Sequence, residues 1–246
     1  MRIASAAVKE KGLQHDRRWM LVDENNIFMT QRIHPSMALF RLSAEGAMCI
    51  ITHGKDSIKL PFIFSGMGPT IQTEVWGNAV TTIEVSGEHT RWFSERLGIK
   101  CRLVFFPEEN SRLVDPSFAV NHEHVSLADG YPFLIIGQSS LNDLNLRLDN
   151  PVPMNRFRPN LVFTGGSPYE EDGWKGFTIG KNRFAGVKPC SRCIITSVNQ
   201  DTGEKGLEPM ATLSGYRKGH GEVYFGQNVL AIDHHEIHEG DEISFE

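Results

Sequence analysis

Short runs in which apolar and polar residues alternate make up most of the first hundred positions. They pair into three predicted hairpins: residues 18–22 with 27–30, 39–43 with 48–52, and 73–76 with 79–85. Alternation with a period of two is typical of half-buried strands, and the links contain Asn, Asp or Gly, which favour tight turns. Closely spaced hairpins of this kind predict a small barrel or sandwich.

Three segments show the spacing of helices instead. In residues 88–97 the apolar side chains fall on one face, and Gly98 predicts the end of that helix. Ser139 or Ser140 is expected to cap a second helix, in which leucines recur every three or four positions. Residues 210–216 are predicted to form a third, short helix.

Strands are predicted again in the rest of the chain, at residues 101–106, 131–136, 161–164, 177–179, 194–198, 229–232 and 242–245. Residues 107–125 are polar and irregular, which is typical of a linker or a long loop. The whole pattern predicts a β-rich α+β fold. We place a domain boundary near Pro107, between an N-terminal β-barrel-like domain of residues 1–106 and a second domain of residues 107–246.

Composition narrows the range of functions. The 246 residues are 40% hydrophobic and 22% charged, as in ordinary globular proteins, so the chain can bury its own core. A net charge of −5 disfavours general nucleic-acid binding. No apolar run approaches the roughly 20 residues of a membrane span, and the first residues lack the apolar region of a signal peptide. We therefore expect a cytoplasmic protein without membrane association.

The segment Lys188-Pro189-Cys190-Ser191-Arg192-Cys193 carries the strongest chemical signal. Basic neighbours favour the thiolate form of cysteine, which binds soft metals or attacks electrophiles. Four interpretations stay open: half of a zinc site, a thioredoxin-like redox pair, two structural thiols, or a metal ligand within a longer motif. The zinc site lacks a second pair, because Cys49 and Cys101 are isolated in strand-like runs. The redox pair would need a following helix, whereas residues 194–198 are typical of a strand.

The longer motif resembles that of a known family. The run Cys190-Ser191-Arg192-Cys193-Ile194, followed by Asp201-Thr202-Gly203, is similar to the signature of MOSC domains. The similarity is to the branch that contains YcbX-like bacterial proteins and the mitochondrial amidoxime-reducing component. This resemblance implies a MOSC-type β-barrel domain that binds a molybdenum–molybdopterin cofactor. It also implies that Cys193 is the molybdenum ligand, with Cys190 as a neighbour and Ser191 in the cofactor site.

Two more segments match the family and supply candidate cofactor contacts. Arg156-Phe157-Arg158-Pro159-Asn160 resembles its Arg-Phe-Arg-Pro-Asn stretch, and the resemblance gives Arg158 and Asn160 a role in cofactor binding. A guanidinium can bind a phosphate or a pterin edge through two hydrogen bonds, and an amide both donates and accepts. Asp129 and Tyr131 match a pair that faces the pterin, although Tyr131 replaces a small hydroxyl residue. Without the family resemblance, Arg156 and Arg158 would be interpreted as surface residues and Asp129 as an ordinary turn residue.

A third match lies near the start of the chain. Asp16-Arg17-Arg18-Trp19 resembles the Asp-Arg-x-Trp stretch that opens the family's N-terminal β-barrel region, which implies a cofactor contact for Arg17. Asp16 is expected to orient a neighbouring arginine or to cap a turn, and Thr30-Gln31-Arg32 also fits the family. A phosphorylated pterin requires cations from distant parts of the chain. We therefore expect Arg17 and Arg158 to lie in one pocket with Cys193.

One family feature is missing from this sequence. Relatives have an earlier strand and a Tyr-Pro-Lys-Ser type loop that helps to hold the cofactor phosphate, whereas this sequence starts at Met1 after that point. Loss of a charge-assisted phosphate contact costs roughly 1.5–3 kcal/mol. Two alternatives stay open: the true start lies upstream of Met1, or this member binds the cofactor with fewer groups. For the sequence as it stands, we expect weak cofactor retention by a chain that folds without the cofactor.

The resemblance implies a molybdenum-dependent oxidoreductase that reduces N-hydroxylated compounds, such as hydroxylaminopurines and amidoximes. The sequence has no Cys-x4-Cys-x2-Cys run for an iron–sulfur cluster, so we expect a separate electron-donor protein of the flavin or iron–sulfur type. Two alternatives stay open: a sulfur or cofactor carrier with a persulfide on Cys193, and a β-barrel binding module without catalysis. His234, His235 and His238 precede a Gly-Asp turn, where exposed histidines are common.

Overall fold

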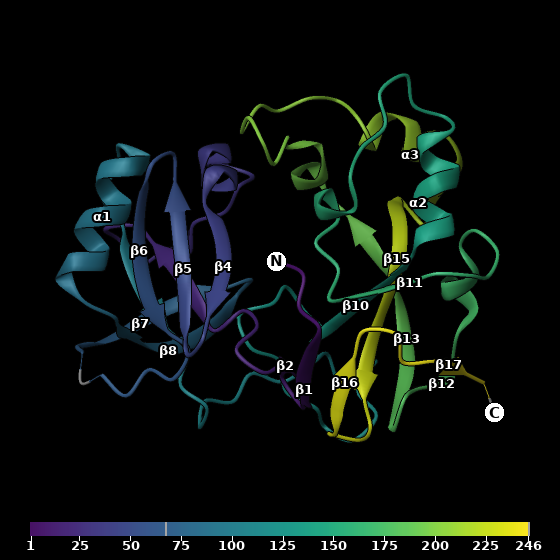
Figure 1. Cartoon of the computed structure of the whole chain (residues 1–246), viewed down its shortest axis with the longest axis horizontal. Helices are drawn as coiled ribbons and strands as arrows, with labels where there is room; N and C mark the ends of the chain where they lie inside the picture. Colours follow the sequence, from purple (N-terminus) through teal and green to yellow (C-terminus); the bar gives the residue numbers. More distant parts are fainter. Residues whose placement is uncertain (67, 246) are drawn as a thin grey trace.

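The computed structural model describes residues 1–66 and 68–245. Strands predominate over helices among these residues, which confirms the β-rich α+β class. Figure 1 shows two lobes, one built from the N-terminal part of the chain in purple and blue, the other from the C-terminal part in green and yellow. No helix of the described residues is long and apolar enough to cross a membrane.

The N-terminal lobe contains two antiparallel sheets and one helix. The first sheet has the order β3 (Trp19–Val22), β9 (Arg102–Phe105), β8 (Asn78–Glu84) and β7 (Thr70–Val75). The second consists of β4 (Arg41–Glu45), β5 (Met48–His53) and β6 (Asp56–Pro61). Helix α1 (Gly87–Leu97) packs Trp92 and Phe93 into a core shared with both sheets. Cys49 and Cys101 are buried in this core, as predicted.

Two of the three predicted hairpins, β4–β5 and β7–β8, are confirmed. In the second, the turn lies at Trp76-Gly77, one residue earlier than predicted, because Val75 pairs with Asn78. Both turn residues have positive φ, at 51° and 81°, which suits the right-handed twist of a tight hairpin. The predicted strand at residues 27–30 is wrong, because the described structure gives it only isolated bridges. Strand β6 was not predicted from the sequence.

The C-terminal lobe is built on one large mixed sheet. Its order is β11 (Leu161–Phe163), β10 (Phe133–Gly137), β15 (Glu222–Ala231), β13 (Asn182–Arg192), β12 (Gly176–Ile179) and β17 (Ile243–Ser244), with β14 (Lys218–Gly219) beside β15. The long β13–β15 pair shifts register between Gly186 and Lys188 and again between Pro189 and Ser191. Such irregularities bend a strand and often occur next to functional sites. Here they precede the cysteine motif.

The C-terminal lobe also contains the α-helices α2 (Gln138–Asn145) and α3 (Met210–Tyr216) and the short 3₁₀ helices η2 (Met154–Arg156), η3 (Glu170–Gly173) and η4 (Ile194–Ser197). The 3₁₀ helix η1 (Pro35–Leu39) lies in the N-terminal lobe, where Met37 packs against the core. The predicted cap of α2 at Ser139 or Ser140 is wrong, since Gly137 occupies the cap position. The buried Glu171 carboxylate accepts from the Gly137 N–H at 3.1 Å and the Ser140 hydroxyl at 2.8 Å. It stabilises the start of this helix from a distant segment.

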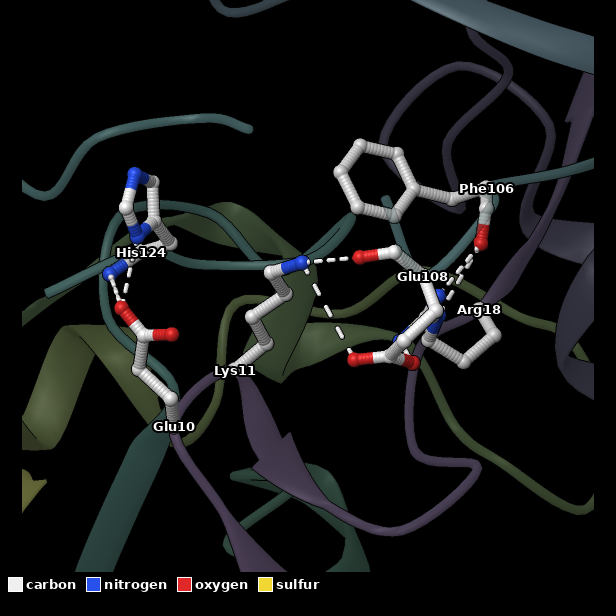
Figure 2. A network of polar contacts seen from close by, with 6 residues as sticks. All are labelled: Glu10, Lys11, Arg18, Phe106, Glu108 and His124. Carbon is white, nitrogen blue, oxygen red and sulfur yellow. Dashed lines mark hydrogen bonds and ion pairs between the residues drawn. The ribbon is translucent and has the colours of Figure 1, made fainter. Parts of the chain in front are cut away.

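The first residues of the chain connect the two lobes. Strand β1 (Ser5–Lys9) pairs with β2 (Gly12–Leu13) and with β16 (Glu236–His238), which comes from the C-terminal end. At the turn of the β1–β2 hairpin, Glu10 accepts hydrogen bonds from the His124 backbone and ring, and Lys11 pairs with Glu108 (Figure 2). These contacts tie the hairpin to residues 107–125, the irregular segment in which we placed the boundary.

Candidate functional site

Cys193 lies where strand β13 ends, and it is the N-terminal cap residue of helix η4. The predicted strand at residues 194–198 is therefore wrong. The backbone N–H and the hydroxyl of Thr196 both donate to the Cys193 carbonyl, at 3.2 and 3.1 Å, and these bonds close a helical turn. A threonine side chain that bonds to nearby backbone competes with strand pairing in this way. The backbone thus changes at Cys193 from an extended strand to a helical turn.

The two thiols of the motif have different surroundings. Cys190 packs against the core around Phe157 and accepts from Arg192 Nη1 at 3.0 Å. Cys193 Sγ accepts from Arg32 Nη2 at 3.3 Å, from the N-terminal lobe. The backbone is extended between them, so their Cα atoms are separated by roughly 10 Å, beyond the roughly 7 Å limit for a disulfide. This geometry disfavours the thioredoxin-like interpretation.

Lys188 contacts an aromatic ring. Its ammonium lies 4.8 Å from the centre of the Phe118 ring. Of the two basic residues in the cysteine segment, Arg192 is therefore the one that contacts a sulfur. Ser191 is exposed, and strand alternation places it on the same face as Cys193.

A chain of contacts leads from Cys193 to the candidate residue Asp129. The Arg32 guanidinium lies 4.8 Å from the centre of the Trp76 ring, a cation–π geometry. Trp76 Nε1 in turn donates to Asp129 Oδ1 at 3.1 Å. The buried Arg112 holds the segment before Asp129, since it donates to the carbonyls of Ser126, Ala128 and Asp129. The thiol and Asp129 are thus linked through the side chains of Arg32 and Trp76.

The structure brings Arg17, Arg158 and Asn160 together. Arg17 Nη2 donates to the Arg158 carbonyl at 2.9 Å, although the two residues are 141 positions apart. Asp16 forms an ion pair with Arg17, as predicted, and accepts from Asn160 Nδ2 at 2.5 Å. Arg17 and Arg158 both have positive φ, 49° and 56°. Such conformations are uncommon outside glycine and occur often at functional sites.

Positive charge is concentrated in this cluster. Desolvation lowers the pKa of Arg158, and the neighbouring charges of Arg17 and Arg192 lower it further. The carboxylates of Asp129 and Asp16 act in the opposite direction. Arginine still stays charged at neutral pH. The cluster therefore contains more guanidinium groups than carboxylates, which favours an anionic ligand.

Tyr131, another candidate residue of the cofactor site, packs against Phe118. Its ring makes an edge-on contact with Phe118 at 6.3 Å. Desolvation, with smaller contributions from Asp115 and Cys190, raises the pKa of Tyr131 to about 12. Its hydroxyl is therefore a neutral donor and acceptor at physiological pH.

Comparison with known proteins identifies the family. Residues 122–244 match the MOSC domain, and residues 1–100 match the MOSC N-terminal beta barrel domain. The chain belongs to the MOSC family. This MOSC chain is 34% identical over 214 residues to mitochondrial amidoxime reducing component 2 of Bos taurus, covering 84% of the chain and 63% of the relative.

Two further relatives extend the comparison. Mitochondrial amidoxime-reducing component 1 of Mus musculus is 32% identical over 227 residues, which cover 87% of this chain and 66% of the relative. Molybdenum cofactor sulfurase of Oryza sativa subsp. japonica is 30% identical over 251 residues, which cover 94% of this chain and 30% of the relative. The MOSC chain therefore spans less than two thirds of each of these three proteins.

Buried donors without partners show what the site of this MOSC protein can accept. Within the described residues, Arg32 Nε, Arg192 Nε and Thr30 Oγ1 are buried and have no hydrogen-bond partner. A buried unpaired donor is costly, and a ligand rich in acceptor atoms satisfies it. Two of these donors belong to the arginines that contact Cys193 and Cys190. A soft thiol beside free guanidinium donors fits a molybdenum–molybdopterin cofactor in chemical character.

Sequence reasoning missed Trp76 and Arg112, and it noted Arg32 only as part of a matching run. The Arg32–Cys193 and Trp76–Asp129 contacts join segments more than 50 positions apart, and those of Arg112 join residues 14 to 17 positions apart. No local pattern carries that information. The positive φ of Trp76 accords with its turn position, but a tryptophan is not typical of such a turn.

Proposed function

We propose that this MOSC protein is an oxidoreductase that binds the molybdenum cofactor and reduces N-hydroxylated compounds. The observation that carries the proposal is the Cys193 thiol at the end of β13, which accepts from the Arg32 guanidinium. Arg32 is linked through Trp76 to Asp129, whose charge acts on Arg158. The names of two relatives, amidoxime reducing components, support the reaction class.

Each candidate residue has a distinct role in this proposal. Cys193 supplies the protein's sulfur ligand to molybdenum, and Arg32 orients that sulfur through its 3.3 Å contact. Arg17, Arg158 and Asn160 bind the phosphate and the pterin edge, while Asp16 fixes Arg17. Asp129, Tyr131 and Ser191 complete the polar wall of the site.

The cofactor, when bound, supplies the two-electron redox chemistry. The substrate N–O bond breaks, and two electrons and two protons convert the N-hydroxylated group into the reduced nitrogen group and water. Neutral groups such as the Tyr131 hydroxyl can donate a hydrogen bond to the substrate oxygen. We expect the electrons to come from a separate donor protein of the flavin or iron–sulfur type.

A carrier function is the second candidate. The rice molybdenum cofactor sulfurase aligns with 94% of this chain, and Cys193 is partly exposed at a corner of the chain. In that case Cys193 holds a persulfide or transfers the cofactor, and no substrate is reduced.

Reduction of benzamidoxime separates the two candidates. Protein loaded with the cofactor, with reduced benzyl viologen as electron donor, is expected to form benzamidine in proportion to its molybdenum content. Chromatography of the product measures the rate, and apo protein is the control. The reductase function is refuted if molybdenum-loaded protein forms neither benzamidine from benzamidoxime nor adenine from 6-hydroxylaminopurine. Mass spectrometry of a Cys193 persulfide would then support the carrier.

A further inference from the structure

A cavity of about 630 Å³ adjoins the loop that carries Asp16 and Arg17. Its walls come from the β1–β2 hairpin, the loop of residues 14–18, the segment after β6, and residues 105–109. Cys193, Arg32 and Arg158 do not line it. A volume of a few hundred Å³ suits a small organic ligand. The proposed cofactor role leaves this cavity unexplained.

One wall of the cavity is aromatic. Phe62 stacks on His15, with ring centres 5.0 Å apart and planes at 22°, and Phe64 contacts Phe105 at 5.3 Å. Desolvation, assisted by the charge of Arg18, lowers the pKa of His15, so the imidazole is neutral at pH 7. The ring nitrogens of His15 form no hydrogen bond within the described part of the chain. A planar ring with polar edge atoms fits this wall.

Basic side chains lie beside the aromatic wall, and the Arg18 guanidinium is 5.7 Å from the centre of the Phe105 ring. Lys11 and Arg18 share the single carboxylate of Glu108, and Arg18 also donates to the Phe106 carbonyl (Figure 2). The ammonium of Lys9 forms no ion pair with any described residue.

Two further carboxylates line the cavity. Asp16 is already paired with Arg17, and Glu109 is exposed. Because Arg17, which does not line the cavity, neutralises Asp16, the lining cations Lys9, Lys11 and Arg18 face two remaining carboxylates, those of Glu108 and Glu109. The remaining positive charge favours an anionic group.

We propose that this cavity binds a planar aromatic anion, a ring that carries a carboxylate or a phosphate. The ring packs against Phe62, Phe64 and Phe105, and the anionic group meets Lys9 and Lys11. Because Asp16 bonds to Arg17 and Asn160 as well, the ligand lies directly beside the arginine cluster. The proposal does not depend on Cys193 or on the cofactor.

Titration calorimetry with two anions and their neutral counterparts tests this proposal on the purified chain. Naphthalene-2-carboxylate is compared with 2-naphthamide, and adenosine monophosphate with adenosine. We expect saturable binding of at least one anion at one site per chain, and binding of its neutral counterpart at least tenfold weaker. The anion that binds more tightly identifies the carboxylate or the phosphate as the natural group.

Matched variants locate the binding. Lys9→Met is expected to weaken binding about tenfold, and Phe62→Leu several-fold, because each removes one of the proposed contacts. Lys55→Met is the control, since Lys55 is exposed in the β5–β6 turn, at the other end of strand β6 from the cavity residue Phe62. The proposal is overturned if neither anion binds saturably at millimolar concentration. It is also overturned if Lys9→Met binds as tightly as Lys55→Met.

Discussion

Replacement of Cys193 by alanine is expected to abolish molybdenum retention, whereas Cys190→Ala keeps most of the metal. The two sulfurs differ in position: Cys193 faces Arg32, and Cys190 packs against the core beside Arg192. A sulfur held at the end of a rigid strand is well placed to act as a ligand. Only one of the two thiols can therefore occupy the ligand position.

Plasma mass spectrometry gives molybdenum per chain for both variants, purified from cells that make molybdopterin. Circular dichroism of each variant verifies that the chain is folded. Equal loss of molybdenum from two folded variants would contradict a single thiol ligand and support a dithiol site.

Phe157→Ala is expected to lower the free energy of unfolding by about 3–5 kcal/mol. Phe157 is fully buried and stacks on Phe225 with ring centres 4.2 Å apart. Its carbonyl accepts from Arg192 Nη2 at 2.7 Å, and Arg158 is the next residue. The cavity left by the ring would therefore loosen the arginine cluster as well as the core.

Chemical denaturation measures this loss, with two controls. Phe157→Leu keeps most of the volume and is expected to cost less than half as much. Phe245→Ala removes a ring that is 52% exposed and is expected to cost about 1 kcal/mol or less. A loss below 1 kcal/mol for Phe157→Ala would show that this ring does not stabilise the segment that carries Arg158.

The elements predicted correctly from the sequence are those determined by local signals. Helix α1 ends at Gly98, whose φ of 68° is unfavourable for other residues, and the β4–β5 hairpin follows the alternation of its side chains. The pairing of β1 with β16 joins residues more than 200 positions apart, and no local signal reveals it.

Two errors have the same physical origin. The β-branched residues after Cys193 favour a strand, but the hydroxyl of Thr196 bonds to the Cys193 carbonyl and stabilises a helical turn. Ser140 is a good cap by type, yet its hydroxyl donates to the distant Glu171 instead. In both cases one hydrogen bond of a polar side chain outweighs the intrinsic preference of the segment.

The residues of the candidate site were identified from the sequence mainly through the family motifs. They selected Cys193, Arg17 and Arg158, which chemistry alone would not distinguish from other cysteines and surface arginines. The contacts of Arg32 required the folded chain, because the one with Cys193 crosses between lobes and the one with Trp76 joins two separate loops of the N-terminal lobe. Their roles in cofactor binding stay predictions.

The molybdenum content of the unmodified chain tests most directly whether this protein binds the molybdenum cofactor. Protein purified from cells that make molybdopterin is compared with protein from cells that cannot, by plasma mass spectrometry of the metal and mass spectrometry of the intact chain. We expect molybdenum at up to one atom per chain in the first preparation and none in the second. Equal, negligible molybdenum in both, with a persulfide on Cys193, would contradict a molybdenum-binding function.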